Sequence, residues 1–360
     1  MQRTSRGLMV TSTGGSARAA HEHPLVAHRA YRARSRTPDR RRRSAPSQPS
    51  GDPNHMEEEQ LQRIKRLAVI ALFSDNDFLE CLVLKGGSAI DLFHPSPGRA
   101  SRDLDFSIDG DFTEAAGALR DRFERLLSET FQPEGLAVFD VEFNATPPPE
   151  RIADLPFWGG YVLKFKLAER DLYEATQKRL NRIPGKRVER EKQKLRARQA
   201  RDVGPGGLKT FTIELSKHEY CKGKEEREID GYVVYVYPPR MIACEKLRAI
   251  CQQIPEYRAT VMSRPGTPRA RDFFDIHYLS ETYSLDWCAR ETAELLQAMF
   301  EAKRVPLSLL SRVIEFRDFH AQGYVSVKET VRPGYPLRDF DFYFDFVVEI
   351  ISRLYPFGNE

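Results

Sequence analysis

Leu82-Val83-Leu84-Lys85-Gly86-Gly87-Ser88-Ala89-Ile90-Asp91-Leu92-Phe93 is the stretch around which we expect the chain to fold. Its first three residues form an apolar run that is long enough for a buried strand. Gly86 and Gly87 allow backbone conformations that other residues resist, and a ligand can approach them closely. Ser88 is predicted to cap the following helix, whose free N–H groups would suit a phosphate. The stretch therefore predicts a strand, a glycine turn and a helix beside a phosphate site.

A second motif follows after a polar loop and reads Arg99-Ala100-Ser101-Arg102-Asp103-Leu104-Asp105-Phe106-Ser107-Ile108. Its second half alternates polar and apolar residues, which is typical of a half-buried strand and puts Asp103 and Asp105 on one face. Two adjacent carboxylates repel each other unless a cation lies between them, and Mg²⁺ prefers one or two carboxylates plus substrate phosphates. An isolated Asp-x-Asp is common in surface strands. The prediction of a magnesium site therefore depends on both motifs lying within about 27 residues.

The charge of the chain is unevenly distributed. The 360 residues are 41% hydrophobic and 30% charged, enough for a sizeable core and one or two domains. Residues 1–55 hold eleven Arg, no Lys and three acidic residues, which gives this tail a charge of about +8. Since the whole chain has a net charge of +4, the remainder carries about −4. Such a segment cannot bury enough apolar surface to order itself, so we expect disorder. The run Arg40–Arg43 could contact nucleic acid, but we favour the alternative that Met56 is the true start.

The sequence shows no targeting signal, and its cysteine usage is typical of a reducing compartment. The tail has no apolar core of the kind found in secretory signals, and no 18-residue apolar run exists for a transmembrane helix. The five cysteines are odd in number and include no Cys-x-x-Cys pair, which favours reduced structural thiols over a zinc site. We therefore expect a cytoplasmic protein without membrane association.

Apolar periodicity predicts the remaining elements. Alternation predicts strands, and apolar residues three and four apart predict helices. The strands are expected at 136–144, 160–167, 208–216 and 229–237, and the helices at 57–78, 112–131, 240–253, 285–303, 307–320 and 339–355.

A basic insertion, residues 171–207, interrupts this pattern. Eleven Lys or Arg lie between Lys178 and Arg201, against only Glu189 and Glu191. We expect a solvated helical or mobile segment, whose charge would attract RNA if it lies near a phosphate-handling site.

Taken together, the two opening motifs resemble nucleotidyltransferases of the DNA polymerase β type. More narrowly, they resemble the AbiEii/AbiGii toxin family of type IV toxin–antitoxin systems. That family carries Gly-Gly-Ser/Thr-Ala-Leu followed by Arg-x-Ser/Thr-x-Asp-Ile-Asp, and here Ile90 and Leu104 replace the usual Leu and Ile. Glu245-Lys246-Leu247-Arg248-Ala249 resembles its Glu-Lys-Leu-x-Ala stretch, and Arg271-Asp272-x-x-Asp275-Ile276 its Arg/Lys-Asp-x-x-Asp-Leu stretch. The resemblance covers about residues 82–279.

The resemblance implies roles for single residues. Lys246 would contact the nucleotide phosphates, Arg271 would hold the triphosphate, and Asp275 would orient one of these two cations. Asp272 and Asp275 lie three apart and so share a helix face. Enzymes of the polymerase β type use a third carboxylate on a strand beside the Asp-x-Asp strand. Glu214 fits that place, and Glu169 is the competitor.

The resemblance also implies the fold and the activity. We expect an α+β polymerase β-like nucleotidyltransferase domain with a short mixed sheet at 56–237, followed by a helical C-terminal domain at 238–360. The expected reaction moves a nucleoside monophosphate from an NTP to an RNA acceptor. The resemblance suggests a toxin that blocks translation by modifying tRNA and that is restrained by a cognate antitoxin. Two Mg²⁺ ions would be bound by Asp103, Asp105 and Glu214. The nucleotide would be held by Gly86, Gly87, Ser88, Arg99, Ser101, Lys246, Arg271, Asp272 and Asp275.

Two other functions remain open at the level of sequence. One is a catalytically silent homologue that only binds RNA, and the intact Asp-x-Asp argues against it. The other is nucleotidyl transfer to a protein or a small molecule, against which the basic insertion favours RNA.

Overall fold

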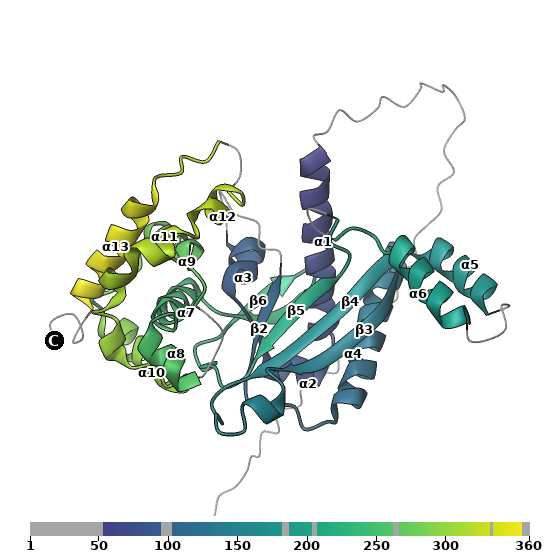
Figure 1. The fold of residues 1–360 in the computed structure, drawn as a ribbon, viewed down its shortest axis with the longest axis horizontal. Helices are drawn as coiled ribbons and strands as arrows, with labels where there is room; N and C mark the ends of the chain where they lie inside the picture. The colour runs from purple at the N-terminus through teal and green to yellow at the C-terminus, as the bar shows by residue number, and fades with distance from the viewer. Residues whose placement is uncertain are drawn as a thin grey trace, which may run out of the picture. The chain divides into compact units, whose positions relative to one another are not determined.

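The computed structural model describes residues 53–94, 103–181, 187–203, 207–261, 266–331 and 334–354 (Figure 1). The Arg-rich tail up to residue 52 and the predicted site residues Arg99 and Ser101 lie outside these ranges. Within the described residues, no helix is both long enough and apolar enough to cross a bilayer.

A mixed sheet of seven strands runs through the structure in the order β3-β4-β5-β2-β1-β7-β6. β1 pairs with β2 in antiparallel and with β7 in parallel orientation, and β2 pairs with β5 in parallel orientation. The α+β class is thereby confirmed. The strands are β1 (Leu82–Lys85), β2 (Leu104–Ile108), β3 (Leu136–Thr146), β4 (Gly160–Glu169), β5 (Phe211–Ser216), β6 (Glu225–Ile229) and β7 (Tyr232–Val236).

Helices surround this sheet and make up most of the chain after β7 (Figure 1). The first half holds α1 (Pro53–Phe73), α2 (Asn76–Cys81), α3 (Gly86–Phe93), α4 (Ala116–Phe131), α5 (Arg170–Leu180) and α6 (Arg187–Gln199). The second half holds α7 (Pro239–Cys251), α8 (Pro255–Val261), α9 (Ala270–Tyr283), α10 (Arg290–Ala302), α11 (Arg317–Ala321), α12 (Tyr324–Lys328) and α13 (Phe340–Arg353).

Burial explains why these segments take these forms. β1 is buried along its whole length, as a short apolar run in the middle of a sheet must be. α4 presents Leu119, Phe123 and Leu127 to the core at helical spacing and packs against β3 and α1. α7 packs against α9 and α10, and α9 against α13, so the second half has its own apolar contacts.

Several predicted elements were wrong in their bounds. The helix expected at 57–78 is two helices, because Asp75 accepts hydrogen bonds from the N–H groups of Asp77 and Phe78 and so begins α2. The helix expected at 112–131 begins only at Ala116. The segment 307–320 contains short 3₁₀ turns before α11 instead of one helix.

The single strand expected at 229–237 is also wrong. It is the end of a hairpin, in which β6 and β7 are joined by Asp230 and Gly231. Their φ angles of 50° and 85° are those of a tight two-residue hairpin turn.

Ser88 does not cap α3, contrary to the prediction. The helix begins at Gly86, so the N-cap is Lys85, which offers no side-chain acceptor. Ser88 lies inside the first turn, and its hydroxyl donates to the carbonyl oxygen of Lys85 at 3.2 Å.

Candidate active site

The turn between β1 and α3 requires a glycine at its first position. Gly86 has a φ of +65°, which L side chains rarely adopt. A Cβ atom there would lie 2.9 Å from Oδ2 of Asp105, so the missing side chain also makes room for this carboxylate. The antiparallel pairing of Lys85 with Asp105 brings the two chain segments together. The predicted glycine turn and the Asp-x-Asp strand are therefore one structural unit.

Three carboxylates meet at the ends of β2 and β5. Asp105 lies directly opposite Glu214 in the parallel register, and Asp103 precedes Asp105 by two residues. All three side chains line one pocket of about 680 Å³, which we call the carboxylate pocket. The competitor Glu169 ends β4, where its carboxylate lies 2.8 Å from Arg201, and among the described residues it does not line this pocket.

The carboxylates influence one another electrostatically. The pKa of Asp105 is raised to about 7, chiefly by burial; Lys85 opposes this rise, and the charges of Glu214, Glu245 and Asp103 add to it. An ionised Asp105 is thus unfavourable in a site that offers it too little positive charge.

Basic side chains from the helices form the opposite wall of the carboxylate pocket. Lys246 of α7 is buried, with its Nζ 3.0 Å from Oδ1 of Asp272 and 2.7 Å from Oδ2 of Asp275. Arg271 of α9 donates from Nε to the hydroxyl of Ser326 at 3.1 Å. Asp275 therefore contacts Lys246, as expected of a residue that orients the lysine. The remaining lining residues include Gly86, Gly87, Ser216, Ala249, Thr267, Pro268 and Arg269.

Of the other predicted nucleotide-binding residues, Ser88 lies outside the carboxylate pocket. Ser88 is fully buried, and its hydroxyl both donates to the Lys85 carbonyl and accepts from the backbone N–H of Asp105 at 3.2 Å. It holds the β1–α3 turn against β2 and does not line the carboxylate pocket. Gly87 does line it, whereas Arg99 and Ser101 fall outside the described residues.

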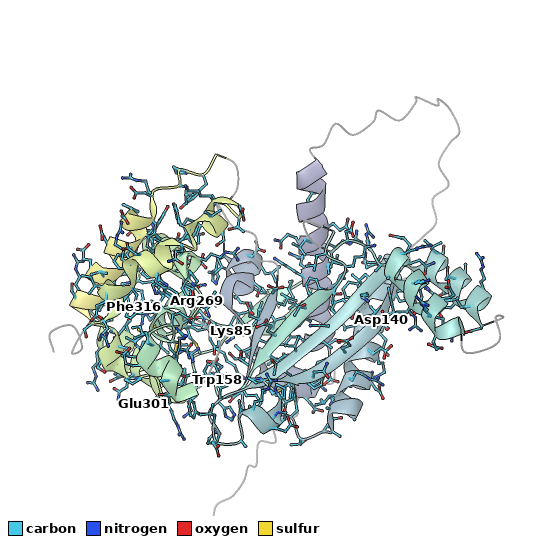
Figure 2. The ribbon with its side chains drawn as sticks, in the orientation of Figure 1. Lys85, Asp140, Trp158, Arg269, Glu301 and Phe316 are labelled. Atoms are coloured by element: carbon cyan, nitrogen blue, oxygen red, sulfur yellow. The ribbon has the colours of Figure 1, made fainter. Side chains whose placement is uncertain are left out.

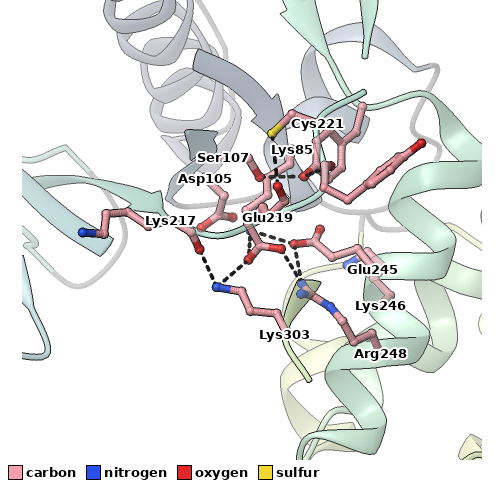
Figure 3. A network of polar contacts seen from close by, with 12 residues as sticks. Lys85, Asp105, Ser107, Lys217, Glu219, Cys221, Glu245, Lys246, Arg248 and Lys303 are labelled. Atoms are coloured by element: carbon pink, nitrogen blue, oxygen red, sulfur yellow. Dashed lines mark hydrogen bonds and ion pairs between the residues drawn. The ribbon is translucent and has the colours of Figure 1, made fainter. Parts of the chain in front are cut away.

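A buried network of charges lies directly behind the carboxylates (Figure 3). Lys85 Nζ lies 2.7 Å from Oε1 of Glu245 and 3.3 Å from Oε1 of Glu219. Glu219 also contacts Arg248 at 2.9 Å and Lys303 at 3.4 Å. All five side chains are nearly excluded from solvent. Lys85 and Glu245 line the carboxylate pocket as well, so the network connects it to the core.

The pKa values in this network show how tightly it is paired. Although burial opposes its charged form, Glu219 and Glu245 raise the pKa of Lys85 above its ordinary value. Burial alone would raise the pKa of Glu219, but Arg248, Lys85 and Lys303 lower it to about 2. Burial lowers the pKa of Lys303 to about 8. The network therefore keeps a cation, Lys85, next to Asp105 at neutral pH.

Sequence reasoning assigned no role to Lys85, Glu219, Glu245, Arg248 or Lys303. For three of them a signal was present: Lys85 adjoins the glycine turn, and Glu245 and Arg248 flank Lys246 in the same motif. Glu219 and Lys303 lie in segments without any pattern that marks a buried charge.

The donor set of the carboxylate pocket suits a hard divalent cation. Carboxylate oxygens are the ligands that Mg²⁺ prefers, and Asp103, Asp105 and Glu214 offer them on neighbouring strands. The like charges that raise the pKa of Asp105 are those that a cation would neutralise. In the part of the chain that the structure describes, no three His, Cys, Asp or Glu side chains already have a metal-holding geometry.

The family comparison assigns the chain to the nucleotidyltransferases. The model of the nucleotidyl transferase AbiEii toxin family, type IV toxin–antitoxin system, matches residues 69–346. The chain therefore belongs to the AbiEii nucleotidyltransferase toxins, whose class implies a nucleotide substrate and an antitoxin partner.

Among solved structures, JHP933 from Helicobacter pylori is 18% identical, with a TM-score of 0.42 over 84% of this chain and 92% of that chain. An antigenic nucleotidyltransferase-like protein from Paracoccidioides brasiliensis is 15% identical, with a TM-score of 0.33 over 76% of this chain and 94% of that chain. No curated protein matches the chain. The assignment to the family depends on the family model.

Proposed function

We propose that this nucleotidyltransferase moves a nucleoside monophosphate from an NTP to a hydroxyl group of RNA, in a reaction that requires Mg²⁺. The observation that carries the proposal is the carboxylate pocket itself. Three carboxylates on β2 and β5 face Lys246 and Arg271 of the helices across one space of about 680 Å³. This arrangement suits a triphosphate with bound Mg²⁺, because the carboxylates would hold the metal ions and the basic side chains would hold the phosphate oxygens.

Each side of the pocket would hold a different part of the reaction. Lys246, kept in place by Asp272 and Asp275, and Arg271 would bind the outer phosphates. The backbone of Gly86 and Gly87, at the N-terminus of α3, would approach the phosphate oxygens. When bound at Asp103, Asp105 and Glu214, two Mg²⁺ ions would lower the pKa of the attacking hydroxyl and neutralise the leaving pyrophosphate.

The reaction balances without further reactants. The acceptor hydroxyl oxygen forms a bond to the α-phosphorus, and the bond from this phosphorus to the oxygen of the β-phosphate breaks. Pyrophosphate leaves, and the hydroxyl proton passes to water. We also propose that residues 56–237 supply the carboxylates and residues 238–360 the cations, so that the pocket lies between two parts of the chain.

Exposed positive charge supports an RNA acceptor. α5 and α6 form the basic insertion and pack against each other, and α5 packs against β3 and β4 at one edge of the sheet. Arg190, Lys194 and Arg198 of α6 are exposed. Such charge attracts RNA through phosphate neutralisation. A toxin that modifies RNA in this way would act in the cytoplasm, where NTPs and RNA are both present.

The acceptor can be identified by following the α-phosphate. The purified protein is incubated with Mg²⁺, each α-labelled NTP in turn and a cell extract, which is then separated into RNA, protein and small molecules. We expect label in the RNA fraction with one or a few of the NTPs. Label in protein or in small molecules alone would contradict the RNA acceptor and leave the nucleotidyltransferase standing.

A further inference from the structure

A second pocket of about 370 Å³ adjoins the carboxylate pocket. The two pockets share the side chains of Lys85, Glu214, Ser216, Glu245, Ala249 and Arg269. Glu214, one of the three carboxylates, is thus at their junction. A molecule in the second pocket would meet an NTP in the first pocket at this carboxylate.

Aromatic rings and cations line the second pocket, which we call the aromatic pocket. Trp158 and Tyr161 are partly buried and both line it. Lys303, which lines the pocket, has its Nζ 5.2 Å from the centroid of the Trp158 ring. Arg248 and Arg269 also line it. Figure 2 shows Trp158 on the same side of the sheet ribbon as Lys85 and Arg269.

Two glycines beside Trp158 are required by close packing of the backbone. Gly159 and Gly160 follow Trp158 and line the same pocket. Gly159 has a φ of +112°, and a Cβ atom there would lie 2.7 Å from Cδ1 of Ile152. A Cβ atom at Gly160 would lie 2.2 Å from the carbonyl oxygen of Leu215, so the backbone at this wall of the pocket requires glycine.

Arg269 supplies a cation at the junction of both pockets. Its side chain is 40% exposed, and its Nη1 lies 3.8 Å from Oδ2 of Asp272, which leaves the guanidinium accessible. Within the described part of the chain, its buried Nε has no hydrogen-bond partner. A phosphate would satisfy such a donor.

We propose that the aromatic pocket binds the unpaired RNA nucleotide that carries the acceptor hydroxyl, an inference that rests on the proposed function. Its base stacks on Trp158, its phosphate contacts Arg269, and its hydroxyl points past Glu214 to the α-phosphorus of the NTP. Stacking on an aromatic ring needs a base whose face is free, which selects single-stranded RNA over a duplex. The rings and cations together fit a nucleotide better than an uncharged apolar molecule.

Intrinsic fluorescence tests occupancy without requiring turnover. The chain has two tryptophans, and Trp287 is buried with its indole N–H donating to Ser280 at 3.0 Å, outside the aromatic pocket. In a Trp287→Phe variant, Trp158 is the single tryptophan. We expect a short single-stranded RNA oligonucleotide to quench its fluorescence in a saturable manner. An equal concentration of the same sequence as a duplex should quench it much less.

Substitution of the ring tests its contribution to transfer. Trp158→Ala should raise the KM for RNA roughly ten-fold or more, since base stacking contributes on that scale. The affinity for NTP should stay unchanged, and Trp158→Phe should keep most of the transfer because it keeps a stacking surface. Tyr232→Ala on β7 is the matched control, since this ring is exposed at 43% and lies outside both pockets.

The outcomes separate this inference from the proposed function. Unchanged RNA KM in a folded Trp158→Ala variant, or quenching by NTP but not by RNA, would overturn the aromatic pocket as acceptor site while RNA labelling continued. If Trp158→Ala does not fold, the fluorescence titration decides alone, and absence of quenching at saturating RNA overturns the inference. Absence of RNA labelling by the wild-type protein would instead contradict the proposed function.

Discussion

Two regions of the molecule carry many charges but hold them differently. The first is the edge of the sheet where β3 and β4 lie next to the basic insertion, which we call the arm end; there Lys192 pairs with Glu189 at 2.9 Å, and the glutamate side chain is 75% exposed. The second is the carboxylate pocket at the central strands, where Lys246 and its partners Asp272 and Asp275 are nearly excluded from solvent. Exposed pairs are screened and contribute little to stability, whereas buried charges need defined partners. Under the proposed function, the exposed charge would serve the encounter with RNA and the buried charge would serve the chemistry.

Removing a pocket carboxylate should have the largest effect. Asp105→Asn or Asp103→Asn should lower the rate of transfer roughly 10³-fold or more, because metal-assisted charge stabilisation supplies several kcal/mol. Initial rates of label transfer measure this. Asp140→Asn at the arm end is the matched control, since Asp140 contacts Lys166 at 3.0 Å and is labelled in Figure 2 far along the sheet from Lys85. An equal loss of transfer rate in Asp140→Asn and in the pocket variants would contradict a special role for the pocket carboxylates.

Neutralising the buried lysine should weaken NTP binding next. Lys246→Gln should raise the Kd for NTP roughly 100-fold, because charge-assisted hydrogen bonds to phosphate are lost. It also leaves two buried carboxylates without their cation, which costs about 3–5 kcal/mol of stability. The double variant Lys246→Gln, Asp275→Asn should recover part of the stability but not the affinity. Recovery of the stability together with the NTP affinity, the latter measured by calorimetric titration, would show that Lys246 acts only in folding.

The pH dependence of stability should distinguish the pocket carboxylate from an ordinary one. The pKa of Asp105 is raised to about 7 from 3.8, so the folded state binds more protons than the unfolded state between these pH values. The carboxylate therefore destabilises the protein increasingly as pH rises through that window, and fully above it. Asp105→Asn should stabilise the metal-free protein by about 4 kcal/mol at pH 8, and hardly at pH 4.

Thermal unfolding over a pH series measures this gain. Addition of Mg²⁺ at pH 8 should stabilise the wild type and leave the variant unchanged. A gain that is the same at pH 4 and pH 8 would contradict the assigned electrostatics of Asp105.

Reversing charge at the arm end should have the smallest effect. Arg190, Lys194 and Arg198, all changed to Glu, should weaken RNA binding roughly three- to ten-fold and flatten its dependence on salt, since fewer counterions are released. NTP affinity should not change. RNA and NTP affinities are measured separately over a salt series. An unchanged salt slope would exclude the arm from RNA binding.

Local sequence pattern was sufficient to predict the glycine turn and the strand that carries the two aspartates. Two glycines between an apolar run and a helix required the β1–α3 turn, and alternation placed Asp103 and Asp105 on one face. Glu214 was expected from the family resemblance, which implies a third carboxylate on a strand beside the Asp-x-Asp strand, and the parallel pairing with β2 sets it opposite Asp105. The Asp230-Gly231 turn was equally visible in the sequence, but the strand before it, Glu225–Ile229, is mostly charged and so was not recognised as a strand.

Tertiary contacts decided the rest. Ser88 looked like a helix cap, yet the backbone N–H of Asp105 reaches its hydroxyl from another strand, which no local pattern encodes. Glu219 and Lys303 are 84 residues apart in sequence and become partners only because the chain folds back, at 3.4 Å. A charged residue in a polar segment is ordinarily exposed, so sequence alone gave no reason to bury them.

The central claim is that the carboxylate pocket transfers a nucleoside monophosphate. Parallel reactions with α-labelled and γ-labelled NTP, using the wild type and Asp105→Asn, test it most directly. We predict that the wild type incorporates the α-label and releases the γ-label as pyrophosphate, and that Asp105→Asn does neither. Incorporation of the γ-label, or α-label transfer that persists in Asp105→Asn, would contradict the account.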